Sequence, residues 1–370
     1  MRPFMDRPSP RLEEHDRVLL IRLGAVGDVL RTLPALHLIR GSFPRLYLSW
    51  MVEGPARDLL VDHPDLDEVI VFPRREMREA ASRLYGLPRR LAALAEDLRR
   101  RRFSVALDFQ GSFKSASLAR MSGAPRRVGF APGHSRELSF LFTNEWVRPR
   151  THHLNRVERN LIMAERIGAT GDAIEVILPE RNDEGQAADT LLRTINPMGS
   201  PVVLLSPGTS PRQRWKRWPV EHYSRLASEL KTAVGALPLV VWGPGEEELA
   251  RSVAASSGGR AEVAPPTSLR LLASILRRAA LFVGADTGPM HLAWSVGCPV
   301  LALFGPTDPR LNAPLGGLHV VLRSGRRTSS ITPDMAYESA RRILAIPAAD
   351  RQTARLLRSS LAPRVAVAGR

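Results

Sequence analysis

The chain is poor in the residues from which disulfides, zinc sites and base-stacking surfaces are built. Its single cysteine, Cys298, excludes an intramolecular disulfide and any zinc site made of several thiolates. Aromatic residues make up 6% of the 370 residues, and the stacking signature of a nucleic-acid-binding protein is missing. No apolar run approaches the ~20 residues of a membrane-spanning helix. Residues 1–16 are rich in Arg, Pro and acids instead of a signal peptide's apolar stretch, so we expect a mobile terminus and a cytoplasmic location.

Lysine is also scarce, although the chain is strongly basic. Lys+Arg 53 against Asp+Glu 37 gives a net charge of +16, and the only lysines are Lys114, Lys216 and Lys231. Such a charge attracts polyanions, namely nucleic acids, anionic membrane surfaces and phosphorylated sugars. Because the excess is almost entirely arginine and is spread along the chain, a preference for Arg codons weakens this argument. Each remaining lysine is therefore a candidate for a specific role.

Apolar runs typical of buried strands alternate with helical patterns in two stretches of the chain. In the first stretch we expect strands at 17–23, 46–52, 68–72 and 103–109, and helices at 28–40, 55–61, 75–102, 112–121 and 155–167. Gly86 and Pro88 should interrupt the third of these helices, and the pattern is lost over 125–146. In the second stretch we expect strands at 202–206, 237–242, 281–284 and 300–304, and helices at 220–232, 246–256, 268–278, 289–296 and 334–344.

This alternation indicates parallel sheets covered by helices on both faces. We therefore predict an α/β protein with two doubly wound, Rossmann-like domains at 17–180 and 201–346. The polar segment 181–200 would join them, and a basic tail, 347–370, would follow. Ligands of doubly wound sheets bind beyond the carboxyl ends of the strands, so the loops at those ends are the places to look for a site.

The first candidate site follows the first predicted strand, at Gly24–Asp28. Glycines at a strand-to-helix turn let the backbone approach a ligand, with amides exposed at the helix N-terminus. Asp28 is equally compatible with a helix cap and with a catalytic carboxylate. The spacing of Gly24 and Gly27 does not match the G-x-G-x-x-G fingerprint, so the dehydrogenase interpretation is disfavoured even though Glu53 follows the second strand.

The second candidate site is the loop after the strand that ends at Ser206. It carries the hydroxyl of Thr209 and three cations within 214–217, which could neutralise a diphosphate. A solvated basic loop anchored by Trp215 and Trp218 is the alternative. Two of only six tryptophans flank one of only three lysines, Lys216, which favours a site.

The third candidate site, at 284–291, is the strongest. A buried strand runs into Asp286, Thr287 and Gly288, and Pro289 opens a helix. Free amides at Thr287 and Gly288 would form an anion cradle reinforced by the helix dipole. Either Asp286 or Thr287 could instead be an ordinary cap, and a lone helical histidine such as His291 is more often structural.

Two further loops could contribute polar contacts. The acids of 246–248 could supply a carboxylate for a ribose, although acids at a helix start usually only favour the dipole. Lys114 follows another strand-to-helix turn and could contact an anionic acceptor. His152 and His153 lack the spacing of metal ligands, and we expect no metal site.

Four motifs, in this order, resemble those of glycosyltransferase family 9, the ADP-heptose:lipopolysaccharide heptosyltransferases. They are RLGAVGDVLRTLPAL (22–36), DFQGSFKSASLARMSGA (108–124), KRWP (216–219) and GADTGPMHLAWSVGCPVLALFGPTDP (284–309). The resemblance extends over nearly all of 17–344 and is greatest to the type that adds the first heptose to Kdo. It implies a GT-B fold with an amino-terminal acceptor domain, a carboxyl-terminal ADP-heptose domain and an active site in the cleft between them.

The resemblance also assigns roles to residues of this chain. Asp28 would be the general base of an inverting, metal-independent transfer, and Lys216 with the amides of Thr287 and Gly288 would stabilise the leaving diphosphate. Donor contacts would come from Thr209, Glu247, Asp286 and His291. Acceptor contacts would come from Arg22, Gly27, Arg57, Lys114 and Arg136. No cofactor is implied beyond the nucleotide-sugar substrate, and the partner would be an anionic, lipid-linked saccharide at the inner membrane surface.

Other interpretations remain beside this one. The chain could be a GT-B transferase that uses another nucleotide sugar, a basic nucleic-acid-binding protein with salt-sensitive affinity, or an inactive sugar-nucleotide binder. The scarcity of aromatics argues against the second alternative. The presence of Asp28, Lys216 and Asp286 argues against the third. The identity of the donor follows only from the resemblance.

Overall fold

The computed structural model of the protein describes residues 11–82, 86–171 and 174–350 and the backbone of 365–366. The chain divides into two compact units, Met1–Ile177 and Leu178–Arg370. Most of the predicted mobile terminus and of the basic tail lies outside the described residues. Within the described part of that terminus, Leu12 is buried and its amide donates to the carbonyl of Ile167 at 3.1 Å.

The first unit is built on a six-stranded parallel sheet of order β3-β2-β1-β4-β5-β6. The strands are β1 (Arg17–Ile21), β2 (Tyr47–Glu53), β3 (Glu68–Phe72), β4 (Val105–Asp108), β5 (Arg126–Phe130) and β6 (Glu145–Val147). Ile21 at the end of β1 is in register with Asp108 at the end of β4. Since the strand order reverses between β1 and β4, their carboxyl ends form the topological switch point at which doubly wound sheets bind ligands.

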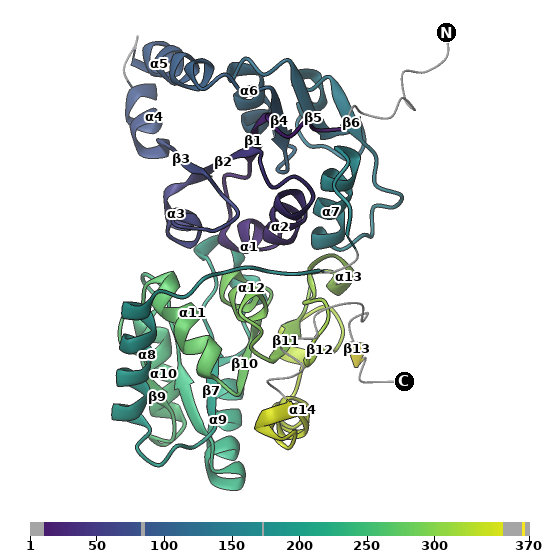
Figure 1. Cartoon of the computed structure of the whole chain (residues 1–370). Coiled ribbons are helices and arrows are strands. Elements are labelled where there is room, and N and C mark those ends of the chain that lie inside the picture. The colour runs from purple at the N-terminus through teal and green to yellow at the C-terminus, as the bar shows by residue number, and fades with distance from the viewer. Residues whose placement is uncertain (1–10, 83–85, 172–173, 351–364, 367–370) are drawn as a thin grey trace. The chain divides into compact units, whose positions relative to one another are not determined.

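Helices cover both faces of this sheet, as Figure 1 shows with α5 and α6 on one side and α2 and α7 on the other. The helices are α1 (Val26–Leu30), α2 (Leu33–Ser42), α3 (Gly54–Leu60), α4 (Arg74–Ala81), α5 (Gly86–Arg100), α6 (Phe113–Met121) and α7 (Arg156–Arg166), with the 3-10 helix η1 (Ser139–Phe142). Capping boxes at Ser112 and Asn155 begin α6 and α7, because each side chain accepts a backbone amide that the first turn leaves unpaired.

The second unit has a seven-stranded parallel sheet of order β13-β12-β11-β10-β7-β8-β9, whose switch point lies between β10 and β7. The strands are β7 (Val202–Ser206), β8 (Leu237–Val240), β9 (Glu262–Val263), β10 (Leu281–Ala285), β11 (Val300–Phe304), β12 (His319–Arg323) and β13 (Val365–Ala366). The helices are α8 (Asn182–Ile195), α9 (Val220–Val234), α10 (Glu247–Ser256), α11 (Leu269–Arg278), α12 (Gly288–Ser295), α13 (Pro309–Asn312) and α14 (Pro333–Leu344), with 3-10 helices η2 (Pro211–Lys216) and η3 (Thr328–Ser330).

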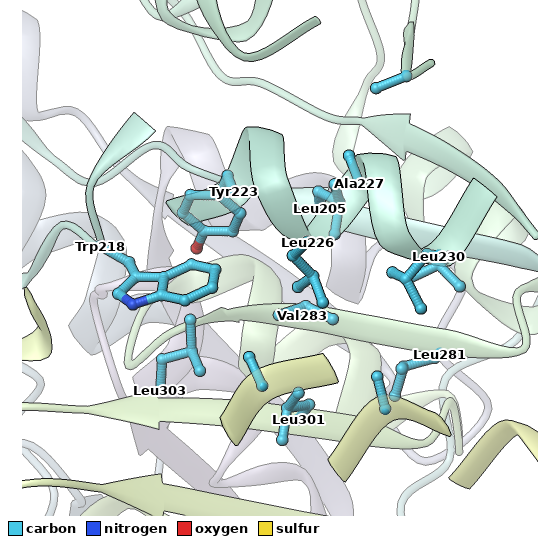
Figure 2. Close-up of a cluster of buried hydrophobic side chains, with 14 of the residues drawn as sticks. Leu205, Trp218, Tyr223, Leu226, Ala227, Leu230, Leu281, Val283, Leu301 and Leu303 are labelled. Atoms are coloured by element: carbon cyan, nitrogen blue, oxygen red, sulfur yellow. The ribbon is translucent and has the colours of Figure 1, made fainter. Parts of the chain in front are cut away.

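Alternate residues of the central strands form the core beneath α9, α10 and α14. On the face of the sheet that α9 covers, Leu281 and Val283 of β10 belong to the same cluster as Leu226 and Leu230 of that helix, as Figure 2 shows. Trp218 belongs to this core, and its indole N–H donates to the carbonyl of Ile331 at 2.8 Å. One of the two tryptophans that favoured a ligand site in the basic loop therefore has a packing role, whereas Trp215 is exposed.

The prediction of one helix over 28–40 was wrong, since α1 ends at Leu30 and α2 begins at Leu33. Pro34 explains the break, because it cannot donate an amide to the preceding turn and its ring crowds that turn. The hydroxyl of Thr32 donates to the carbonyl of Asp28 at 2.9 Å and closes the short first helix. As a result α1 is a single turn at the switch point.

The ranges expected from the sequence leave out the strands β5, β6, β9, β12 and β13 and the helices α8 and α13. β5 and β6 lie in the stretch 125–146, where charged residues obscure the apolar pattern; Arg126 and Glu145 form an ion pair between them at 2.8 Å. The segment 181–200 contains α8, which packs on α11, and Arg278 of α11 pairs with Glu180 at 2.7 Å. This segment is thus part of the second unit. Among the described residues, no helix combines the length and the apolar character that crossing a membrane requires.

Candidate active site

A strongly cationic pocket lies at the switch point of the first unit. Its lining comes from the loops after β1, β4 and β5 and from α7, and comprises Arg22, Asp28, Arg31, Phe109, Gln110, Arg136, Arg156, Arg159 and Asn160. Five guanidinium groups therefore surround a single carboxylate. A pocket with this balance of charge is suited to a ligand that carries more than one negative charge.

Asp28 is held between two arginines. Its carboxylate pairs with Arg22 at 2.9 Å through Oδ2 and with Arg31 through Oδ1, and 28% of its side chain is exposed. Burial raises the pKa of Asp28, but the charges of Arg22, Arg31 and Arg156 outweigh that effect and hold the pKa well below its ordinary value. Asp28 is thus ionised, with its oxygens engaged by cations.

The arginines of the pocket are positioned by backbone carbonyls. Arg22 donates to the carbonyl of Phe109 at 2.6 Å, and the backbone carbonyl of Arg22 itself accepts the indole N–H of Trp50 at 3.1 Å. Arg31 donates through Nε to the carbonyl of Gly27 at 3.2 Å. These bonds fix both guanidinium groups before any ligand arrives, which reduces the entropy lost on binding.

Burial and mutual repulsion lower the pKa of two arginines that α7 contributes to the pocket, Arg156 and Arg159. Burial, together with the charges of Arg156, Arg22 and Arg136, lowers the pKa of Arg159 to about 10. The pKa of Arg156 is also lowered, first by burial and then by Arg31. An anionic ligand would relieve this repulsion, so the electrostatics favour occupation of the pocket by negative charge.

Asp108 lies behind the pocket at the end of β4 and is fully buried. Its Oδ1 accepts the amides of Gln110 at 3.0 Å and of Gly111 at 2.9 Å, which shapes the loop that lines the pocket. Burial raises the pKa of Asp108 to about 6, against the opposing effects of these amides and of Ser115. In turn, the side-chain oxygen of Gln110 accepts the amide of Leu23 at 2.9 Å and ties the β4 loop to the β1 loop.

The pocket brings together some of the predicted acceptor residues and leaves others elsewhere. Arg22, Asp28 and Arg136 line it, and Gly27 contributes a carbonyl to Arg31. Lys114 instead pairs with Glu53 at 2.6 Å and lies over the ring of Phe72, whereas Arg57 is exposed on α3; neither lines the pocket. Sequence reasoning did not assign Arg31, Arg156 or Arg159 to the site, although Arg31 lies within the motif at 22–36.

The second unit has a buried ionic cluster at its own switch point, after β7 and β10. Lys216 donates to both the backbone carbonyl of Asp286, at 3.0 Å, and its Oδ2, at 3.1 Å. His291 lies 3.3 Å from Oδ1, and the amide of Asn312 donates to Oδ2 at 3.3 Å. Burial raises the pKa of Asp286, but His291 and Lys216 together hold it well below its ordinary value.

The turn that follows Asp286 exposes backbone donors. Thr287 is the N-cap of α12, its side chain makes no cap hydrogen bond, and Gly288 and Pro289 begin the helix. The amides of such a first turn have no partner within the helix. The loop after β7 adds Thr209, whose hydroxyl accepts from Nε of Arg217 at 3.2 Å. The segments that follow β7 and β10 at this one switch point thus contain the predicted donor residues Thr209, Lys216, Asp286, Thr287, Gly288 and His291.

Glu246, and not the predicted Glu247, is directed toward this site. Glu247 pairs with Arg251 at 2.6 Å on the exposed face of α10. Glu246 precedes the helix and accepts the amide of Gly243 at 3.1 Å. A Cβ atom at Gly208 would lie 1.9 Å from Oε2 of Glu246, so this carboxylate rests against the loop after β7. The sequence does not distinguish these two positions, since they belong to a run of three consecutive glutamates.

Comparison with known proteins defines the class to which these two sites belong. The family model of glycosyltransferase family 9 (heptosyltransferase) matches residues 91–338. Lipopolysaccharide heptosyltransferase 1 of Escherichia coli K12 is 29% identical over 84% of this chain and 94% of its own length. The protein of the same name from Pseudomonas aeruginosa PAO1 is 29% identical over 83% of this chain and 84% of its own length.

Solved structures agree with the family model. The structure described as E. coli heptosyltransferase WaaC with ADP-2-deoxy-2-fluoro heptose has a TM-score of 0.69 and 28% sequence identity to this chain. The match covers 88% of this chain and 99% of the chain in that structure. The chain is therefore a glycosyltransferase with the GT-B fold. It belongs to glycosyltransferase family 9, the heptosyltransferases.

The raised pKa of Asp108 predicts a pH-dependent effect of the Asp108→Asn substitution. In the folded protein the pKa is about 6 instead of 3.8, so ionisation costs stability, and this cost grows as the pH rises through that interval and then stays constant. It amounts to roughly 3 kcal/mol. The melting temperature of Asp108→Asn relative to the parent should therefore increase between pH 4 and pH 8.

Thermal unfolding followed by circular dichroism across this pH range measures the difference. Asp183→Asn is the matched control, because Asp183 is exposed at the start of α8. A difference between the Asp108 variant and the parent that is the same at every pH would show that folding does not raise the pKa of Asp108.

Proposed function

We propose that this chain transfers heptose from ADP-heptose to a Kdo-containing lipopolysaccharide inner-core acceptor, with inversion at the anomeric carbon. The family assignment and the names of the similar proteins support heptose as the sugar and lipopolysaccharide as the acceptor class. The observation that carries the proposal is the pairing of two sites at two switch points. One is an arginine pocket with a single carboxylate, and the other is a buried Lys216–Asp286–His291 cluster beside first-turn amides of α12, which have no partner within the helix.

On the donor side, these residues match the parts of ADP-heptose. The amides of Thr287 and Gly288 and the ammonium group of Lys216 would bind the diphosphate, which gains negative charge as the sugar leaves. Asp286 orients the ammonium group of Lys216 through the 3.1 Å ion pair. Glu246 against Gly208 is the carboxylate best placed to accept hydroxyls of the ribose, and Thr209 lies on the same loop. These donors take the role that a metal ion has in other transferases.

On the acceptor side, the arginine pocket would bind the negative charges of the Kdo sugars, with Asp28 as the general base. An acceptor hydroxyl attacks the anomeric carbon, the bond from that carbon to the diphosphate oxygen breaks, and ADP leaves. The hydroxyl proton passes to the carboxylate of Asp28. A single displacement of this kind inverts the anomeric centre, and the reaction requires that the acceptor hydroxyl and the donor's anomeric carbon meet.

The ion pairs of Asp28 add a condition to this mechanism. A carboxylate held by Arg22 and Arg31 is a weak base, because both cations stabilise its ionised form. An anionic acceptor bound to the same arginines would partly neutralise their charge. The arginines would then stabilise ionised Asp28 less, so the proton affinity of Asp28 would rise. The acceptor would in this way strengthen the base that acts on it, whereas water, which carries no charge, would not.

Transfer is tested by incubating the purified protein with ADP-heptose and a Kdo-lipid acceptor and following the release of ADP, with UDP-sugars as alternative donors. We expect release that depends on both ADP-heptose and the acceptor. Release from a UDP-sugar in preference to ADP-heptose would assign the chain to another nucleotide sugar.

The Asp28→Asn variant should keep its affinity for ADP-heptose while the turnover number falls by about 10²–10⁴-fold, because asparagine cannot take the proton. Isothermal titration with ADP-heptose and the ADP-release assay measure the two quantities. Turnover near that of the parent would remove Asp28 from the role of base. Asp183→Asn serves again as the exposed control, and it should match the parent in both measurements.

The Lys216→Ala variant should bind ADP about 10–100-fold more weakly and turn over more slowly, because a charge-assisted contact to the diphosphate is lost. Lys231→Ala is the matched control, since Lys231 is exposed on α9. Melting curves separate a folding defect, which the unpaired Asp286 could cause, from a binding defect. Unchanged ADP affinity in a folded Lys216 variant would mean that the lysine only compensates Asp286.

The Arg31→Gln variant tests the influence of the acceptor's charge on Asp28. Loss of one cation should raise the pKa of Asp28, so the acid limb of the pH profile of kcat/KM should move to higher pH. The KM for the acceptor should also rise by about 10-fold or more. An acid limb at the same pH as in the parent, together with a raised KM, would confine Arg31 to acceptor binding.

A further inference from the structure

Half of the exposed large hydrophobic side chains among the described residues gather in one part of the first unit. Phe113, Leu138, Leu141 and Trp146 are 53%, 62%, 67% and 38% exposed, respectively. The others, Val71, Leu91, Met198 and Trp215, are distributed elsewhere along the chain. We call the four grouped side chains, which lie on α6, η1 and β6 and on the turn before η1, the η1 patch.

Contacts link the members of the η1 patch to one another. The ring of Phe113 packs edge-on against Phe142 with centroids 5.1 Å apart, and Phe140 packs against Trp146 at 6.4 Å. The amide of Leu141 donates to the carbonyl of Leu138 at 3.1 Å. Since Phe140, Leu141 and Phe142 are all in η1, this one short helix has a contact with the residue of each other side chain of the patch.

The turn that begins η1 places leucine where the backbone does not favour it. Glu137 and Leu138 have φ angles of 53° and 56°, the left-handed region that glycine and asparagine adopt more readily. Two backbone hydrogen bonds hold this turn. The amide of Arg136 donates to the carbonyl of Gly111 at 2.8 Å, and the amide of Ser139 donates to the carbonyl of Arg136 at 2.9 Å. Because Leu138 is both strained and exposed, the folding of this unit does not account for a large apolar residue there.

The η1 patch is linked to the cationic pocket through Arg136. Arg136 directly precedes the strained turn and also lines the pocket, and Arg148, two residues after Trp146, is exposed. An apolar surface that includes Trp and Phe and is flanked by arginines matches the boundary of an anionic bilayer, where aromatic rings lie at the level of the headgroups and cations meet lipid phosphates. A symmetric second copy would instead bring the same arginines against each other.

We propose that the η1 patch docks on the surface of an anionic lipid bilayer, with Leu138 and Leu141 entering its apolar boundary. Arg136 would then lie at headgroup level and direct the arginine pocket toward saccharides that project from the membrane. Docking itself depends only on this surface. Its use in catalysis rests on the proposed function, in which the acceptor is a lipid-linked saccharide.

Sedimentation with vesicles of phosphatidylglycerol and phosphatidylethanolamine tests the docking. The double variant Leu138→Asn/Leu141→Ser removes two exposed leucines and eases the left-handed turn, since asparagine tolerates it. We expect its apparent affinity for the vesicles to fall roughly tenfold or more. Met198→Ser is the matched control, because Met198 is 90% exposed and lies in the second unit; it should bind as the parent does.

The proposal is overturned if the parent and the double variant sediment equally with the vesicles. It is also overturned if the parent does not sediment with them. A parent that is dimeric and a double variant that is monomeric by light scattering would overturn it in favour of a second copy as the occupant.

A transfer assay separates this result from the proposed function. The double variant should match the parent on a water-soluble acceptor without acyl chains and lose activity on an acceptor in vesicles. A parent inactive on both acceptors would contradict the proposed function, and the sedimentation result would still decide the docking.

Discussion

The ion pairs of Asp28 with Arg22 and Arg31 are the interaction on which the first site depends. They keep two buried guanidinium groups compensated in a pocket where three more arginines crowd the same space, and they hold the carboxylate ionised. A one-residue change in the register of β1 against β4 would move Arg22 away from the carbonyl of Phe109, which holds its guanidinium group beside Asp28. The parallel pairing of β1 with β4 thus fixes the electrostatics as well as the fold.

Buried charge is compensated differently in the two units. In the second unit Lys216, Asp286 and His291 form a cluster in which one carboxylate is shared by a lysine and a histidine, and backbone amides nearby remain available. In the first unit cations outnumber the carboxylate, so an anionic ligand is needed to complete the balance. This contrast is consistent with a donor whose charge is met largely by dipoles and an acceptor whose charge is met by side chains.

Much of the architecture could be predicted from the sequence, because continuous apolar strands such as 202–206 and 300–304 leave little ambiguity about a parallel sheet. The loops after β1, β7 and β10 were found because unusual residues follow buried strands there. Sequence reasoning failed where the determining contacts are distant. Arg156 and Arg159 reach the pocket from α7, and no local pattern distinguishes them from the many other arginines of this chain.

Two other differences have a local physical origin. Pro34 breaks the helix that apolar periodicity extended across it, and the choice between Glu246 and Glu247 depends on where α10 begins. Trp218 resembled a site residue because it is a rare residue next to Lys216. It is instead the side chain that anchors this loop to the core, and so it positions Lys216 without facing the ligand.

The close approach of Gly208 to Glu246 also restricts how this chain can vary. A methyl group at position 208 would occupy the space of the Glu246 carboxylate, whose flexible stem allows it to swing aside without disturbing the sheet. Alanine at this position would therefore be tolerated by the fold yet would redirect an acid beside the loop after β7. Among homologous sequences, the identities of these two residues should change together.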